Sequence, residues 1–208
     1  MHRLTRRMVK RGILALLLFP VLLAAVPAAA VSLYFPHVDT NAPWQTEIAV
    51  INTSDTEGLT GTLRALSNTG ETVETRALTL AARGRSQMSV ASAFTDHARI
   101  GYIVLDTNSN TVQGYTKFFI AGSYRAAVPA VREINTADIL VPHIDSGAVW
   151  WTGLSLVNTT AETKTLTITF NNGQSRPITL AANEHTAYEI ARDFFNNEPQ
   201  PGIQSAVI

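Results

Sequence analysis

A long segment of this chain occurs twice. Residues 35–53 recur 106 positions later as residues 141–159, and both segments contain Pro-His-x-Asp, then a tryptophan, then an alternating run that ends in Asn-Thr. Residues 78–82 match residues 178–182 at a slightly smaller offset. Such self-similarity, with small slips between the matches, indicates two copies of one folding unit. A residue that recurs in the same setting in both copies more often serves the fold than a single active centre.

The first 30 residues have the pattern of a secretory signal. A basic start is followed by an almost unbroken apolar run over residues 13–26 and by three alanines at residues 28–30. Small residues at that place are what a signal peptidase accepts. The apolar run is shorter than the roughly 20 residues that cross a bilayer, and retention as an anchor is the alternative. We therefore expect an exported protein, periplasmic, at the cell surface or extracellular, with no membrane span after signal removal.

The net charge and the cysteine content exclude several classes of partner and of site chemistry. Five of the 16 basic residues lie in the predicted signal, so the rest of the chain carries 11 basic and 16 acidic residues, a net charge of −5. Nucleic acid and anionic membranes require clustered Lys and Arg, so we expect neither as a partner. The chain has no cysteine, which excludes a disulfide framework, a thiolate nucleophile and a Cys-ligated metal. Export without cysteine is more typical of a bacterial envelope or secreted protein.

Short alternating runs rich in Thr, Val, Ile and aromatic residues fill residues 31–132, which we predict to be the first unit. Turn sequences such as residues 67–70 separate the runs, with a glycine placed for positive φ. Roughly seven short strands, with a turn about every 8–12 residues, indicate an antiparallel β-sandwich. The predicted strands cover residues 46–52, 60–66, 73–80, 86–90, 100–105, 112–120 and 124–128.

The second unit is predicted over residues 137–208, after a short polar linker at residues 132–136. One helical turn is expected within residues 188–195, where apolar residues share a helical face, and residues 89–94 are its counterpart. The fold class is therefore all-β, with two tandem immunoglobulin-like antiparallel sandwiches. The strands expected in the second unit cover residues 153–157, 164–170, 176–180, 186–189 and 204–208.

The second copy is expected to lack its last strands. Residues 203–208 align with residues 100–105, after which the first copy continues with two further strands. Their absence would leave unpaired backbone at a sheet edge. Either the sequence is a piece of a longer array, or a partner strand completes the sheet, so we expect a protein partner or self-association through this edge. The apolar side chains expected to lose cover are Val157, Phe170, Ile190 and Ile208.

Two His-x-Asp pairs are the residues most suited to chemistry. Residues two apart in an extended segment point the same way, so His37 with Asp39, and His143 with Asp145, could each bind a metal or form a base dyad. No third His, Asp or Glu recurs at matching positions. We favour the alternative that each Asp caps the following turn while the His packs beside it. We therefore expect no catalytic residue, metal or cofactor, and keep these four residues as candidates for ligand binding.

Three tryptophans are candidates for a contact surface. Exposed tryptophan anchors partners or stacks on sugar rings, whereas buried tryptophan plugs one end of a sandwich. Trp44 and Trp150 occupy matching positions, and we favour burial for both. Trp151 faces Gln45 of the first copy, so we expect Trp151 to be the exposed tryptophan and a candidate glycan contact.

Evidence for glycosylation or hydrolysis is thin. Asn52 and Asn158 formally begin glycosylation sequons, but both end the same predicted strand, where Asn tolerates a turn and bonds its backbone. The sequence has no Gly-x-Ser-x-Gly, no Ser–His–Asp order repeated in a unit and no glycine-rich phosphate loop. Acidic surfaces commonly offer carboxylate pairs of the kind used in glycoside hydrolysis. The carboxylates available for such a pair are Asp39, Asp55, Glu57 and Asp96.

The repeated motif resembles a tandem β-sandwich module of secreted and cell-surface proteins of environmental bacteria, which stands beside adhesive or immunoglobulin-like domains. The resemblance covers nearly all of the chain after the signal. It implies a non-catalytic sandwich in an envelope or extracellular setting, and it supplies no site residues. The residues that carry it are Phe35-Pro36-His37, Trp44-Gln45-Thr46, Val50-Ile51-Asn52-Thr53, Gly101-Tyr102 and Gln113-Gly114-Tyr115.

These observations lead to one expected function and two alternatives. We expect an exported, non-catalytic structural, adhesive or assembly module of a bacterial envelope or extracellular protein. The first alternative is a carbohydrate-binding protein that uses exposed aromatic residues. The second is a hydrolase with a site near the His-x-Asp segments.

Overall fold

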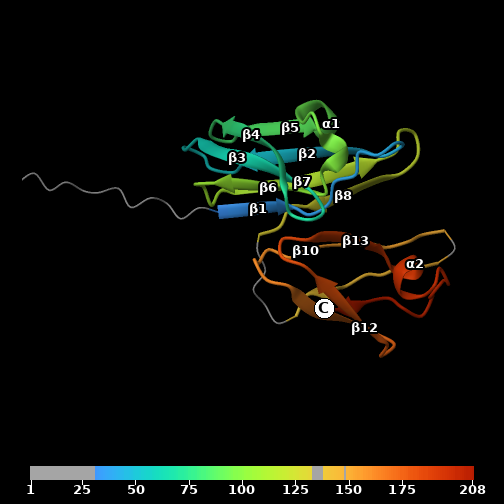
Figure 1. Cartoon of the computed structure of the whole chain (residues 1–208). Coiled ribbons are helices and arrows are strands. Elements are labelled where there is room, and N and C mark those ends of the chain that lie inside the picture. The colour runs from blue at the N-terminus through green and yellow to red at the C-terminus, as the bar shows by residue number, and fades with distance from the viewer. Residues whose placement is uncertain (1–30, 133–137, 148) are drawn as a thin grey trace, which may run out of the picture.

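Antiparallel β-strands dominate the computed structural model of this chain (Figure 1). The structure describes residues 31–132, 138–147 and 149–208. The predicted signal at residues 1–30 and most of the predicted linker lie outside the described residues. The helical segments in the described ranges are single turns. The predicted all-β class is therefore confirmed.

The first unit is a sandwich of two four-stranded antiparallel sheets, with the strand orders β1-β6-β3-β4 and β5-β2-β7-β8. A helical turn, α1 (Val90–Ala93), and a 3₁₀ turn, η1 (His97–Arg99), connect β5 to β6. The strands are β1 (Val31–Phe35), β2 (Gln45–Asn52), β3 (Leu59–Leu66), β4 (Thr72–Leu80), β5 (Arg85–Ser89), β6 (Tyr102–Thr107), β7 (Val112–Phe119) and β8 (Arg125–Pro129).

Strand alternation places one face of each sheet in the core of this unit. In β2, Ile48 and Val50 are two residues apart, so both point inward, and both are fully buried. Leu63 of β3 pairs with Leu105 of β6, and both side chains join the same core cluster from the opposite sheet. Burial of an aliphatic side chain contributes about 1.5–3 kcal/mol. The facing aliphatic layers therefore hold the two sheets together.

The second unit repeats this plan with fewer strands. One sheet has the order β12-β11-β14-β9, and the other consists of β10 and β13. By position and register, β9 to β14 correspond to β1 to β6, and the described residues contain no counterpart of β7 or β8. The elements are β9 (Leu140–Val141), β10 (Gly153–Val157), β11 (Lys164–Phe170), β12 (Ser175–Leu180), β13 (His185–Glu189), the helical turn α2 (Ile190–Phe194) and β14 (Ala206–Val207).

The core of the second unit is better covered than the sequence predicted. Phe170, Ile190 and Ile208 were expected to lose cover, yet they are 2%, 0% and 8% exposed. The helical turn after β13 explains the difference, because the phenylalanine at its end and the one that follows it pack against the core. The ring centroids of Phe194 and Phe195 lie 5.8 and 5.0 Å from that of Phe170.

The pairing of the edge strands in this sandwich differs from the pairing in the immunoglobulin fold. In the immunoglobulin fold the first strand pairs with the second, and the seventh pairs with the sixth. Here β1 pairs with β6, and β7 pairs with β2. Neither β1 nor its counterpart β9 was among the strands expected from sequence. Both are short, and each is fixed by a partner far along the chain rather than by a local hairpin.

The two units lie one above the other, with β1 and β8 of the first facing β10 and β13 of the second (Figure 1). The first unit therefore presents a sheet edge and an outer sheet face to the second unit. The candidate site lies at this boundary.

Candidate functional site

A small apolar cluster joins the two units. Leu66 of β3 and Tyr102 and Val104 of β6 point away from the first core, yet all three are at most 5% exposed. Val157 of β10 packs against this cluster from the second unit. The outer face of the first sheet is therefore part of the boundary between the units, and Val157 is partly buried against the first unit.

Hydrogen bonds across the boundary converge on His185, the first residue of β13. Its backbone N–H donates to Asn68 O at 2.9 Å, and its ring Nδ1 lies 2.8 Å from Asn68 Oδ1. On the other side of the ring, Nε2 lies 3.0 Å from Ser155 Oγ, and the Ser155 hydroxyl also contacts the Pro36 carbonyl. His185 is 5% exposed. The boundary is thus formed by specific polar contacts as well as by apolar packing.

A second set of contacts brings the β3–β4 turn against the loop before β13. The Tyr102 hydroxyl donates to Asn183 O at 2.9 Å. Gly70 has a φ of +83°, and a Cβ at that position would lie 2.4 Å from the Cβ of Asn183. Glycine at residue 70 therefore satisfies both the turn, which needs positive φ, and the close approach of the second unit.

Burial at the boundary disfavours positive charge on its two histidines. Burial lowers the pKa of His185 to about 4, and the nearby His37 acts in the same direction. Burial also lowers the pKa of His37, although the charge of Asp39 opposes the shift. The two rings lie 5.8 Å apart. Both histidines are therefore neutral near neutral pH, as a desolvated imidazole is expected to be.

The contacts of Ser155 with His185, and of His185 with Asn68, have the arrangement of a nucleophile, a base and an orienting group. Two features favour a structural role for them. The Ser155 hydroxyl has a single proton, and the Pro36 carbonyl competes for it with the His185 ring. Ser155 also lies in the middle of β10, where neighbouring backbone N–H groups point to opposite edges of the strand, so they do not converge on one oxyanion. We therefore assign these three residues to docking of the units.

Beside these contacts lies a cleft between the units with a volume of about 510 Å³. This volume falls in the usual range of small-ligand sites, about 300–1,000 Å³, and such sites are common between domains. The second unit contributes Trp151, Gly153, Leu154, Ser155, Ala187, Tyr188, Glu189 and Arg192. The first unit contributes Pro36, His37, Asp39, Trp44, Phe118 and Val128.

The cleft combines aromatic surfaces with nearly balanced charge. Trp44 packs edge-on against Phe118, with ring centroids 6.1 Å apart, and both rings border the cleft. Arg192 is paired with Glu189 at 3.4 Å and with Asp193 at 2.8 Å. Its charge is therefore matched by carboxylates, which disfavours phosphate or another anion as the ligand. Flat apolar faces beside carboxylate acceptors suit a neutral molecule that has both apolar faces and hydroxyl groups.

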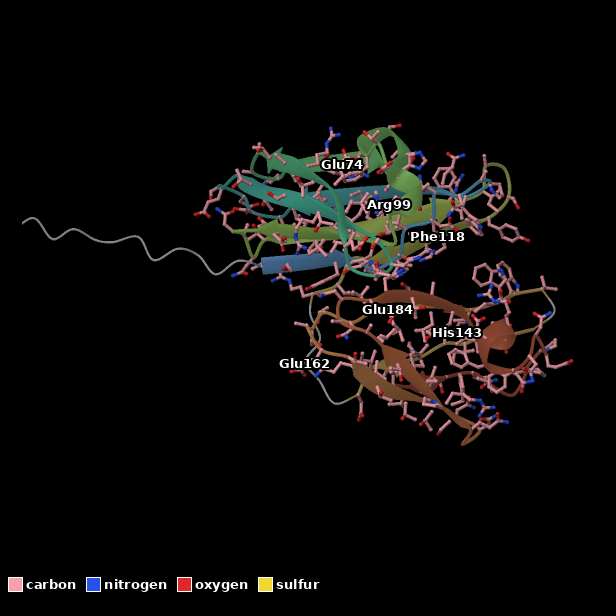
Figure 2. The ribbon with its side chains drawn as sticks, in the orientation of Figure 1. Glu74, Arg99, Phe118, His143, Glu162 and Glu184 are labelled. Atoms are coloured by element: carbon pink, nitrogen blue, oxygen red, sulfur yellow. The ribbon has the colours of Figure 1, made fainter. Side chains whose placement is uncertain are left out.

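Some of the candidate residues predicted from the sequence lie together in the structure, and others lie apart. His37, Asp39 and Trp151 all line the cleft. His143 and Asp145 do not, although they match the first pair in sequence. Figure 2 shows His143 in the lower unit and Phe118 in the upper unit. The two copies of the motif therefore differ in their surroundings, and only the first lies at the boundary.

The aspartates of both His-x-Asp pairs cap turns, as favoured from the sequence. Asp39 Oδ1 accepts a hydrogen bond from Asn41 N at 2.9 Å, and Asp145 Oδ1 accepts one from Gly147 N at 2.9 Å. His37 packs edge-on against Phe118, with centroids 5.4 Å apart. His143 is exposed, so the expectation of a packed histidine is wrong for the second copy.

The expectation that Trp44 and Trp150 are both buried is also wrong. Trp44 is half-buried against Phe118 of β7 and Tyr124 in the turn before β8. Trp150 is 69% exposed, because the described part of the second unit has no equivalent of β7 and β8 to cover it. Trp151 is 46% exposed, so the expectation that it is exposed is confirmed.

The two sequon asparagines are structural. Asn52 and Asn158 are 1% and 5% exposed. Asn52 Nδ2 donates to the carbonyls of Glu57 and Ala81 at 2.7 and 3.0 Å. Asn158 makes the same kind of bonds in the second unit. The predicted role in bonding the turn is therefore confirmed.

Four aromatic or charged residues of the cleft were not found from the sequence. They lie outside the repeated motif, on β7, β13 and α2, and nothing in the linear order brings them together. The only signal in the sequence was the i,i+3 spacing of Glu189 and Arg192 in an expected helical turn. The residues are Phe118, Tyr188, Glu189 and Arg192.

Comparisons with protein-family models, with curated proteins and with solved structures gave no match for this chain. In the described ranges, no group of three or more His, Cys, Asp or Glu residues is arranged to hold a metal ion. No helix in those ranges is long and apolar enough to cross a membrane.

Proposed function

We propose that this chain is an exported, non-catalytic adhesive module of a bacterial envelope or extracellular protein, and that it binds a neutral glycan in the cleft between its two units. The observation that carries the proposal is that Trp44 of the first unit and Trp151 of the second border the same cleft. The secretory pattern of residues 1–30 and the resemblance to surface-protein modules support the extracellular setting.

The chemistry of the cleft supports a sugar as the ligand. A pyranose ring has an apolar C–H face that packs on an aromatic side chain, and hydroxyl groups that need hydrogen-bond acceptors. Trp44, Phe118 and Trp151 supply the aromatic surfaces, and the carboxylates of Asp39 and Glu189 supply acceptors. The pairing of Arg192 with its two carboxylates argues for a neutral sugar over a sulfated or phosphorylated one.

A glycan array followed by calorimetry on residues 31–208 tests the proposal. We expect one class of neutral oligosaccharide to bind and Trp151→Ala to weaken that binding about tenfold or more, which corresponds to about 1.4 kcal/mol. Trp150→Ala is the matched control, because Trp150 is exposed beside Trp151 but does not line the cleft. An array without a hit, or equal loss in both variants, would contradict the proposal.

The hydrolase alternative is tested on the same protein. We expect no turnover of ester or glycoside substrates that depends on Ser155 or His37. Turnover that Ser155→Ala abolishes while the melting temperature changes little would show that the Ser155–His185 pair is catalytic. The same result for His37→Ala would establish a site at the first His-x-Asp segment.

A further inference from the structure

The two-stranded sheet of the second unit has fewer strands than its counterpart in the first unit. In the first unit, β2 has a neighbour on each side, since it pairs with both β5 and β7. Its counterpart β10 pairs with β13, and on its other side the described residues supply no strand. β10 is therefore a sheet edge at a position where the same fold elsewhere in this chain is closed.

Alternation along β10 identifies the backbone groups at this edge. Asn158 N donates to Glu184 O, and Ile190 N donates to Thr152 O, so residues 152 and 158 bond toward β13. Successive residues of an antiparallel strand bond alternately to either side. The N–H and C=O groups of Gly153, Ser155 and Val157 therefore point to the open side.

The equivalent groups of β2 are paired with β7. Thr53 N donates to Thr111 O, which places the odd-numbered residues of β2 on the β7 side. In this register Ala49 is opposite Tyr115, and Ala49 corresponds to Ser155 of β10. The first unit thus shows how a strand would pair with β10.

The core beneath the open edge is only partly covered. Leu154 and Leu156 belong to the second core but are only partly buried. Their counterparts Ile48 and Val50, which lie beneath β7, are 0% exposed. The open edge therefore combines unpaired backbone with an uncovered apolar strip, the two features that strand addition uses.

We propose that β10 accepts an extended segment of another polypeptide as an added antiparallel strand, and that this segment has the alternating character of β7. The inward side of β7 carries Val112 and Thr116, both buried, while Gln113 on the other side is exposed. The added strand is therefore apolar or small on the face toward Leu154 and Leu156. Its other face is polar, since Gly153 and Ser155 open toward the cleft.

One position of β7 is restricted to glycine. Gly114 lies opposite Val50, and a Cβ there would lie 2.7 Å from the Ala49 carbonyl oxygen and 2.9 Å from the Phe35 ring. In the second unit, Val141 replaces Phe35 at the matching position, where it pairs with Ala206 as Phe35 pairs with Ile103. The smaller valine relieves the contact with the ring but not the contact with the backbone of the neighbouring strand, so the segment that fits β10 keeps a glycine opposite Leu156.

A synthetic peptide with the sequence of residues 111–119, which contains β7 without β8, tests the proposal on the chain purified as residues 31–208. We expect saturable binding to the chain. Amide exchange should slow at Gly153, Ser155 and Val157, whereas the amides of Leu154 and Leu156, which face β13, should be protected with or without peptide.

Two modified peptides separate strand pairing from nonspecific apolar binding. N-methylation at Tyr115 removes an N–H that faces the acceptor strand, and we expect it to weaken binding about tenfold or more. N-methylation at Thr116, whose N–H faces away, is the matched control and should leave binding nearly unchanged. A peptide with Gly114→Val should bind more weakly than the unaltered peptide, because its Cβ would meet a carbonyl oxygen of the acceptor strand.

Three results would overturn the proposal. The first is the absence of peptide-dependent protection at residues 153, 155 and 157. The second is equal binding of the two N-methylated peptides. The third is concentration-dependent protection of these amides without peptide, which would identify a second copy of this chain as the occupant. Trp151→Ala leaves the backbone of β10 in place, so this variant should still bind the peptide. The test of strand addition is therefore independent of the test of glycan binding.

Discussion

His185 of the second unit and Asn68 of the first meet twice across the boundary, through backbone at 2.9 Å and through side chains at 2.8 Å. His185 is also the first residue of β13, which pairs with β10. The docking contact is therefore continuous with the small sheet of the second unit, and loss of docking would expose a histidine that the folded chain keeps neutral.

Acid should weaken the docked structure. Burial lowers the pKa of His185 to about 4, whereas a histidine in an unfolded chain has a pKa of about 6.5. Between these values the unfolded chain binds a proton that the folded chain excludes. Stability should therefore be highest above about pH 6.5, fall as pH decreases toward 4, and level off below it. The shift corresponds to roughly 3 kcal/mol, and the lowered pKa of His37 acts in the same direction.

Denaturant unfolding at about pH 7 and about pH 4.5 measures this effect, with the window set by the two pKa values. His185→Gln should remove most of the His185 contribution to the pH dependence, because glutamine does not titrate. His143→Gln is the control, since His143 is exposed. A pH dependence that is the same in both variants would show that His185 does not govern the acid response.

Asn68→Ala should destabilise the docked units by about 1–3 kcal/mol, the usual cost of leaving a buried polar atom without its partner. The side-chain partner of the buried His185 Nδ1 would be lost, while the backbone bond would remain. Asn108→Ala is the control, because Asn108 is an exposed turn residue of the same unit. Equal unfolding free energies for the two variants would contradict the role given to Asn68.

The sequence predicted the architecture better than the site. Repetition, alternation and turn residues are local properties, and they were sufficient to predict most strands and the capping roles of Asp39 and Asp145. The cleft was not predictable in this way, because it depends on how two units pack. Phe118 of β7 and Arg192 of α2 become neighbours of one cavity only after both units have folded and docked.

The tryptophans show why matching sequence positions need not have matching surroundings. Trp44 and Trp150 align in the repeat, but the rings that pack on Trp44 come from Phe118 and Tyr124. These rings belong to the part of the first unit that has no described counterpart in the second. A prediction from the repeat alone therefore assigned to Trp150 a burial that only the first copy provides.

Trp44→Ala and Trp150→Ala should differ in their effect on stability. Trp44 is half-buried against two aromatic rings, so its removal should cost on the order of 2 kcal/mol, from lost apolar burial and ring contacts. Trp150 is 69% exposed, so its removal should change stability by about 0.5 kcal/mol or less. Parallel thermal melts of the two variants measure the difference, and equal shifts would show that Trp44 does not depend on β7 and β8.

Asn52→Ala and Asn158→Ala should each destabilise the unit that contains the asparagine. Each side chain bonds two or more carbonyls in its own unit, and Asn52 is the donor to Glu57 O and Ala81 O. Its loss leaves these acceptors without the Asn52 amide as a donor, at a cost of about 1–3 kcal/mol. Amide exchange resolved by unit is the measurement. Faster exchange should appear in β2 and β3 for the first variant and in β10 and β11 for the second. Enzymatic glycosylation of either folded asparagine would contradict its burial, because a modified amide cannot keep these bonds.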